Sequence, residues 1–206
     1  RARLKREKAD GFHILCLLPV RNGEADLPGY FESVARFSDG ILALDDGSTD
    51  RTRTLLESNP LVRCVLENPV RDSYLGWNDS ANRQRLLAEA HVFRPRWILS
   101  LDADERISED DAEALMDFLR NGALADMAYG FQVFRMQDGE CQTYDRNKLW
   151  AYRLFAFRPG QRFPERPLHG VPVPETIPED RWFKTTLRIQ HLGGSNAERR
   201  RMRFEK

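Results

Sequence analysis

Two aspartates separated by one residue follow a run of apolar residues. The run at residues 97–101 leads directly into Asp102, Ala103 and Asp104. Carboxylates placed two apart beyond a buried strand can reach one hard cation through oxygen ligands, and Mg²⁺ and Mn²⁺ take their remaining positions from water and substrate phosphates. Such a triplet is also common in solvated turns and at helix starts. The pair therefore indicates a metal site only if other parts of the chain support it.

A second acidic cluster supplies that support. The segment DDGSTD at residues 45–50 follows another apolar run. An aspartate at this place can accept hydrogen bonds from a nucleobase N–H or a ribose hydroxyl. The same segment is also typical of a glycine turn in which Ser48 or Thr49 caps a helix. Both interpretations hold together, because Asp45 and Asp46 are not needed for the cap.

The elements that must position these clusters alternate between strands and helices. Apolar runs predict strands at residues 12–20, 41–44, 62–66 and 97–101. Helical spacing and helix-forming residues predict helices at residues 27–34, 50–58, 81–90 and 109–120, the last capped by Ser108. Such alternation favours a mostly parallel sheet covered by helices, which binds ligands at the carboxyl ends of its strands. Both acidic clusters lie at those ends.

The pattern changes after residue 121. Strands are expected at residues 127–135 and 149–157, with loops rich in proline and glycine between residues 159 and 178. A strand-like stretch at residues 187–190 precedes His191, and we expect a short basic helix at residues 197–206. A lone histidine after a strand is usually structural.

The composition narrows the functional classes. The 206 residues suit one α/β domain, and 32 basic residues balance 32 acidic ones, so no global field favours nucleic acid. No apolar stretch approaches the ~20 residues of a membrane span, and we expect a soluble domain. Three cysteines without a CxxC pair favour reduced thiols in the cytoplasm. The opening at Arg1 lacks a secretory signal pattern, and we expect a piece of a longer protein.

Three segments in order, LLPVRNGE, ILALDDGSTDRT and WILSLDADERIS, resemble the family-2 glycosyltransferases of GT-A fold. The resemblance covers residues 12–120, and RLFAF and IQHLGGSNAERRRMRFEK are similar to bacterial members with a late histidine. It implies an α/β, Rossmann-like GT-A fold, with a mostly parallel sheet flanked by helices and a smaller mixed C-terminal half. The whole chain, 1–206, is then one domain, with a nucleotide-sugar-binding half at residues 11–120 and an acceptor-binding half at residues 121–206.

The resemblance also implies roles for individual residues. Asp46, with Asp45 beside it, matches the aspartate that contacts the base or ribose, and Arg83 matches an arginine that approaches the donor phosphates. Gln84 stands where the family has Asn. The positions matched to nucleotide-sugar contacts are Pro19, Arg21, Glu24, Asp45, Asp46, Arg83, Asp102 and Ala103.

The implied metal ligands are Asp104 and His191, with Mn²⁺ or Mg²⁺ as the cofactor. Asp102 matches the aspartate on the ribose side, and Asp104 matches the metal ligand. His191 resembles the late histidine that some GT-A enzymes use as another ligand. Glu105 is expected to support the metal pair or to start the next helix.

The catalytic base is left open among three residues. An inverting transfer needs a carboxylate or imidazole within hydrogen-bond reach of the acceptor hydroxyl. Family members often carry Glu-Asp or His-Glu in the second half, whereas the corresponding stretch here is ERPLHGVPVPE, with His169 followed by Gly170. Glu165, His169 and Glu175 are the candidates.

We therefore expect an inverting transfer from a nucleoside diphosphate sugar, UDP-type before others, to a hydroxyl of a glycan, lipid-linked, lipopolysaccharide-type or protein acceptor. No nucleic acid partner is expected. The basic residues Arg199 to Arg201 and Arg203 fit contact with the inner face of the membrane, although such clusters more often form a solvated helix face. Two alternatives are a non-catalytic nucleotide-sugar-binding domain and a nucleotidylyltransferase, which would want a glycine-rich phosphate loop after the first strand.

Overall fold

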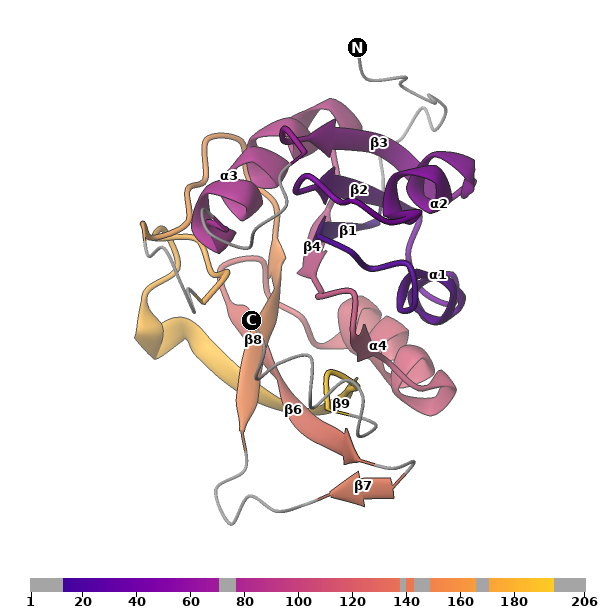
Figure 1. Ribbon diagram of the computed structural model, residues 1–206. Helices are drawn as coiled ribbons and strands as arrows, with labels where there is room; N and C mark the ends of the chain where they lie inside the picture. Colours follow the sequence, from indigo (N-terminus) through magenta and orange to yellow (C-terminus); the bar gives the residue numbers. More distant parts are fainter. Residues whose placement is uncertain (1–12, 71–76, 138–139, 143–148, 166–170, 195–206) are drawn as a thin grey trace.

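The computed structural model describes residues 13–70, 77–137, 140–142, 149–165 and 171–194 (Figure 1). These residues form one mixed sheet with the strand order β3-β2-β1-β4-β8-β6-β9-β5, and β7 pairs with β6. The strands are β1 (Ile14–Val20), β2 (Gly40–Asp45), β3 (Val62–Glu67), β4 (Trp97–Ser100), β5 (Glu105–Arg106), β6 (Ala128–Gln137), β7 (Glu140–Gln142), β8 (Trp150–Ala156) and β9 (Trp182–His191).

Helices cover both faces of the sheet. Residues of α1, α2 and α4 pack into the core on one face, whereas α3 and η1 pack on the other (Figure 1). The helices are α1 (Leu27–Val34), α2 (Thr52–Ser58), α3 (Asp79–Glu89) and α4 (Glu109–Asn121), with short 3₁₀ turns η1 (Ala90–Phe93) and η2 (Glu179–Arg181).

The first four strands form the parallel part of the sheet, as the alternation predicted. Strand β1 pairs in parallel with β2 and with β4, and β2 pairs in parallel with β3. Every residue of β1 is buried: Cys16 and Leu18 belong to one core cluster, and Leu15 and Leu17 belong to the other. A strand covered on both faces is apolar throughout, which explains the continuous run in the sequence. The carboxyl ends of β1, β2 and β4 therefore lie along one edge.

The second half continues the same sheet with mixed directions. Strand β8 pairs antiparallel with β4, β6 pairs antiparallel with β8, and β9 is parallel to β6 and antiparallel to β5. The smaller mixed half is thus confirmed. Strand β9 begins well before the apolar stretch at residues 187–190, and the two-residue β5 was not predicted because it is too short for any periodicity. The helix expected at residues 197–206 lies outside the described residues.

Two helix starts differ from the prediction in detail. The Asn78 side chain accepts a hydrogen bond from Ala81 N–H, so α3 begins earlier than residue 81. The capping of α2 by Ser48 or Thr49 was wrong: the Asp50 carboxylate accepts from Thr52 N–H at 2.9 Å instead. The predicted Ser108 cap of α4 is confirmed, since its hydroxyl accepts from the N–H of Asp111.

Two of the cysteines are free and buried. Burial raises the pKa of Cys16 to about 12 and that of Cys64 to about 11, so both thiols stay protonated. The Cys141 side chain lies outside what the structure describes. Within the described ranges, no helix has the length and apolar character needed to cross a membrane.

The turn after β2 requires glycine. Gly47 has φ +71°, and a Cβ at this position would lie 2.2 Å from the carbonyl oxygen of Pro69. Gly160 has a similar φ of +82°, but a Cβ there would meet no atom within 4 Å. A side chain would therefore strain the backbone at both positions, but it would meet a steric clash only at Gly47.

We predict that Gly47→Ala lowers the free energy of unfolding by about 3 kcal/mol, since the strain of a positive φ adds to the clash with Pro69. Gly160→Ala, the matched control, should lose only about 1 kcal/mol through the backbone conformation. Urea unfolding of both variants measures the difference. Equal losses would show that the close approach to Pro69 is without energetic consequence.

Candidate functional site

The two predicted metal ligands lie side by side. Strand β9 pairs with β5 so that His191 stands opposite Glu105, and Leu192 N–H donates to the carbonyl oxygen of Asp104 at 2.8 Å. As a result, His191 Nε2 lies 3.6 Å from Asp104 Oδ2, and both side chains are partly exposed. The short ladder thus brings together two side chains that are far apart in the sequence.

The Asp104 and His191 side chains offer one carboxylate and one imidazole, which are ligands for Mn²⁺ and, through the carboxylate, for Mg²⁺. Within the described parts of the chain, no group of three or more His, Cys, Asp or Glu side chains could hold a metal ion. A cation at this pair would need further oxygen ligands. The pair therefore fits a metal that is shared with a bound phosphate and water.

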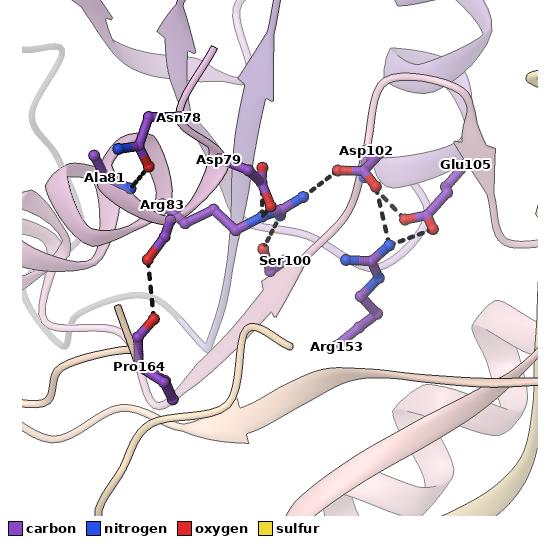
Figure 2. Close-up of polar contacts among 10 residues, drawn as sticks. Asn78, Asp79, Ala81, Arg83, Ser100, Asp102, Glu105, Arg153 and Pro164 are labelled. Carbon is purple, nitrogen blue, oxygen red and sulfur yellow. Dashed lines mark hydrogen bonds and ion pairs between the residues drawn. The ribbon is translucent and has the colours of Figure 1, made fainter. Parts of the chain in front are cut away.

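Asp102 is held by two arginines (Figure 2). Arg83 Nη2 donates to Asp102 Oδ1, and Arg153 Nη2 donates to Asp102 Oδ2 at 2.9 Å. Burial alone would raise the pKa of Asp102, but the two guanidinium groups outweigh it and hold the pKa well below the usual range. The Asp102 carboxylate is therefore ionised and fixed in orientation.

The Arg83 guanidinium is engaged on all three nitrogens. Its Nε donates to both carboxylate oxygens of Asp79 at 3.0 and 2.9 Å, and its Nη1 donates to Ser100 Oγ at 2.6 Å (Figure 2). The side chain is only 5% exposed. In this structure Arg83 joins α3 to the end of β4 and to Asp102. Its contact with donor phosphates stays a prediction.

Glu105 is buried and contacts Asp102 and Arg153, while its expected support of the metal pair stays a prediction. Its Oε1 accepts from Arg153 Nη2 at 2.6 Å, and its Oε2 accepts from Asp102 N–H at 2.9 Å. Burial raises the pKa of Glu105, while Arg153 opposes this effect. Arg153 was not predicted as a site residue. The only sequence signal for it was the RLFAF segment, which it opens.

The Asp45 and Asp46 side chains lie at the carboxyl end of β2 and are almost fully buried. Asp45 Oδ1 accepts from Ser48 N–H at 3.0 Å, and Asp46 Oδ1 accepts from the side-chain amide of Asn68. The same amide donates to Asn82 Oδ1 at 2.9 Å. Neither asparagine was predicted. Asn68 follows β3 and Asn82 lies within α3, and no sequence motif singles out either residue.

The loop after β1 is bound to the loop after β2. Backbone N–H groups of Asn22 and Gly23 donate to the hydroxyls of Ser48 and Thr52 at 2.9 and 2.7 Å. Hydrogen bonds therefore join the two loops at the edge of the sheet. Of the residues predicted to line a nucleotide pocket, Pro19 lies in β1 and Arg21 is buried directly after it.

Glu24 adds a further contact between the same two loops at the protein surface. Its carboxylate accepts from the backbone N–H of Arg51 at 2.9 Å and forms an ion pair with the Arg51 guanidinium at 2.6 Å. The side-chain hydrogen bond from Arg51 lowers the pKa of Glu24. Glu24 thus has a structural contact here, and its predicted role at the nucleotide remains untested.

Two of the three candidate bases line one groove beside α3. The groove has a volume of about 930 Å³ and includes Glu165 and Glu175 in its wall, together with Asn78, Ser80, Ala81, Gln84, Arg85, Arg162 and Phe163. His169, the third candidate, lies outside the described residues. Gln84 Oε1 accepts from Phe163 N–H at 2.8 Å, and Ser80 Oγ donates to the Pro164 carbonyl at 2.9 Å. These bonds fix the groove wall to α3.

We predict that Arg83→Met lowers the free energy of unfolding by about 3–5 kcal/mol, because Asp79 and Asp102 lose a buried cation. Arg85→Met, on the exposed side of the same helix, should cost about 1 kcal/mol or less. Denaturant unfolding of both variants makes the comparison. An Arg83→Met protein as stable as the wild type would contradict the structural role and would favour a role confined to ligand binding.

Comparison with known proteins finds a protein family whose model matches most of this chain. The family model described as glycosyl transferase family 2 matches residues 16–175. An uncharacterized protein of Mycobacterium tuberculosis is 27% identical over 93% of this chain and 49% of its own length. The lipopolysaccharide core biosynthesis glycosyltransferase LpsC of Rhizobium meliloti is 33% identical over 59% of this chain and 40% of its own length. The chain thus spans about half the length of the curated relatives it matches, or less.

Solved structures show the same fold at low identity. The mannosyltransferase PcManGT of Pyrobaculum calidifontis aligns with a TM-score of 0.55 and 14% identity, over 88% of this chain and 57% of that one. Staphylococcus aureus TarS aligns with a TM-score of 0.51 and 15% identity, over 74% of this chain and 30% of that one. The predicted α/β GT-A fold is confirmed. Since the family model covers well over half of its residues, this chain belongs to glycosyl transferase family 2.

Proposed function

We propose that this chain transfers a sugar from a nucleoside diphosphate sugar to a hydroxyl group of an acceptor, with inversion and with Mn²⁺ or Mg²⁺ as the cofactor. The observation that carries the proposal is the pairing of β5 with β9, which places His191 Nε2 3.6 Å from Asp104 Oδ2 at the edge where β1, β2 and β4 end. The Pyrobaculum structure contains GDP-Man and Mn²⁺, the ligand class proposed here.

The donor would lie along the carboxyl ends of the parallel strands. Asp45 and Asp46 at the end of β2 are the acceptors for a base or ribose group. Asp102 keeps 34% of its side chain exposed, and a carboxylate has lone pairs beyond the two that its arginines use. Asp104 and His191 would hold the metal, which when bound neutralises charge on the departing diphosphate.

The acceptor would occupy the groove beside α3 that Glu165 and Glu175 line. One of these carboxylates, or His169, takes the proton from the acceptor hydroxyl as its oxygen forms a bond to the anomeric carbon. The bond between that carbon and the diphosphate oxygen breaks, and the electron pair leaves with the diphosphate. Attack from the side opposite to the leaving group inverts the anomeric centre.

The proposed acceptor class rests on the description of a curated relative and not on the residues that line the groove. LpsC, one of the curated relatives, is described as a lipopolysaccharide core biosynthesis glycosyltransferase. We propose a glycan of the lipopolysaccharide or lipid-linked type before a protein acceptor. Such an acceptor would bring this chain to the cytoplasmic face of the cell membrane as a peripheral partner.

We predict that UDP or GDP binds the wild-type chain more tightly in the presence of Mn²⁺, as measured by calorimetry. Asp104→Ala should remove at least about tenfold of that metal-dependent gain, because one of two protein ligands is lost. Asp117→Ala, an exposed aspartate of α4, is the control and should bind like the wild type. If neither nucleotide binds even with Mn²⁺, the donor site is assigned wrongly for this chain.

A second measurement separates an enzyme from a non-catalytic domain. We predict that the wild type turns over a UDP- or GDP-sugar, to acceptor or to water. One of Glu165→Gln, Glu175→Gln and His169→Gln should reduce kcat by about 10²–10⁴-fold with unchanged diphosphate affinity. Binding without any turnover would favour the non-catalytic alternative, and three fully active variants would show that none of the three candidates is the base. Transfer of a nucleotidyl group in place of a sugar would identify a nucleotidylyltransferase.

A further inference from the structure

The Asn68 side chain lies between the end of β2 and helix α3, and each of its polar atoms has a partner. Its Nδ2 donates to Asp46 Oδ1 and, at 2.9 Å, to Asn82 Oδ1. Its Oδ1 accepts from Arg85 Nη1. An amide nitrogen carries two hydrogens, and both are used here. Asn68 therefore joins the acidic end of β2 to two residues of α3.

Arg85 fixes the orientation of this amide. A guanidinium group can only donate hydrogen bonds, so the Asn68 oxygen must point toward it and the nitrogen must point away. Arg85 Nη2 also donates to the carbonyl oxygen of Glu67 at 3.3 Å, which holds the guanidinium against the end of β3. The nitrogen of Asn68 is thus the atom that reaches Asp46, where it meets a carboxylate oxygen that accepts its hydrogen.

Strand pairing places Asn68 beside Asp46. The register of β2 with β3 sets Asp45 opposite Glu67, and the next residue, Asn68, donates its backbone N–H to the Asp45 carbonyl at 2.9 Å. Only 1% of Asp46 is exposed, and a carboxylate buried to this extent needs hydrogen-bond donors in place of water. Asn68 supplies one such donor from a backbone that is bound to the same strand end.

From these contacts we propose that Asn68 is a positioning residue for nucleoside binding, because its amide holds the Asp46 carboxylate in the orientation that accepts a hydrogen bond from the donor. The inference rests on the proposed contact between Asp46 and the base or ribose. An ionised carboxylate has about four lone-pair sites, so one hydrogen bond from Asn68 does not exhaust the group. Without the amide, the Asp46 side chain would have to be ordered on binding, at a cost in entropy. Asn68 acts through Asp46 and needs no contact of its own with the ligand.

The first test measures the affinity of UDP and GDP by calorimetry, with and without Mn²⁺, for the wild type and for Asn68→Ala. Asn68→Ala should weaken binding of the preferred nucleotide about tenfold, the scale of one hydrogen bond to a charged group. The factor by which Mn²⁺ strengthens nucleotide binding should stay unchanged, because the metal is proposed to bind Asp104 and His191 on other elements. General damage to the site would reduce both quantities, and that result would contradict the inference.

Asn59→Ala is the matched control. Asn59 lies just before the opposite end of β3, and its Oδ1 accepts from the backbone N–H of Leu61 at 2.9 Å. This variant removes an asparagine hydrogen bond from the same strand without touching the end that carries Asn68. It should bind both nucleotides like the wild type.

A second test exchanges the two side chains. In Asp46→Asn, the Asn68 nitrogen attracts the new amide oxygen, so an N–H group replaces the acceptor that meets the nucleoside, and affinity should fall at least about tenfold. Adding Asn68→Asp turns the amide at position 46 round, because the new carboxylate accepts from its nitrogen and its oxygen is again available to the nucleoside. The double variant should therefore recover most of the lost affinity. Asn68→Asp alone places two carboxylates against each other and should bind weakly.

The outcomes separate the inference from the function on which it rests. If Asp46→Asn weakens nucleotide binding but Asn68→Ala binds like the wild type, the positioning role is wrong and the donor site stands. The same conclusion follows if the double variant binds no better than Asp46→Asn. If Asn68→Ala does not fold, the exchanged pair still decides the question. If Asp46→Asn binds like the wild type, the base-side contact and the inference fall together, and if the wild type binds neither nucleotide even with Mn²⁺, the proposed function falls with them.

Discussion

The ion-pair chain from Asp79 through Arg83, Asp102 and Arg153 to Glu105 connects three parts of the fold that are far apart in the sequence. Asp79 and Arg83 come from α3, Asp102 and Glu105 from the turn after β4, and Arg153 from β8. Burying charges is costly, so such a chain is stable only when each member keeps its partners. The geometry of the site and the stability of the sheet therefore depend on the same contacts.

The parallel part of the fold was largely predictable because its signals are local. Strands β1, β2 and β4 are buried on both faces and appear as apolar runs, and the acidic clusters follow β2 and β4 at positions that any parallel sheet would use. Asp104 and Asp46 could be selected by residue type and place alone. The burial of these side chains and their hydrogen-bond partners could not be predicted from the sequence.

The remainder depends on strand order, which no local pattern contains. Arg153 becomes a site residue only because β8 pairs with β4, and His191 meets Asp104 only because β9 pairs with a strand of two residues. The Ser48 hydroxyl was expected to cap a helix, and no role was predicted for Thr52, but both hydroxyls accept hydrogen bonds from the neighbouring loop. In each case the partner is distant in the sequence, so composition and spacing could not reveal the contact.

The late position of β9 has a consequence for synthesis of the protein. The parallel strands β1 to β4, with Asp45 and Asp46 at the end of β2, lie in the first half of the chain and pair with one another, so their contacts form early in a growing chain. His191, in contrast, belongs to the last strand that the structure describes, and its pairing with β5 closes a long loop. A nascent chain on the ribosome thus acquires the strand ends that carry Asp45 and Asp46 well before it acquires His191. The Asp104–His191 pair is therefore completed only after translation has passed residue 191.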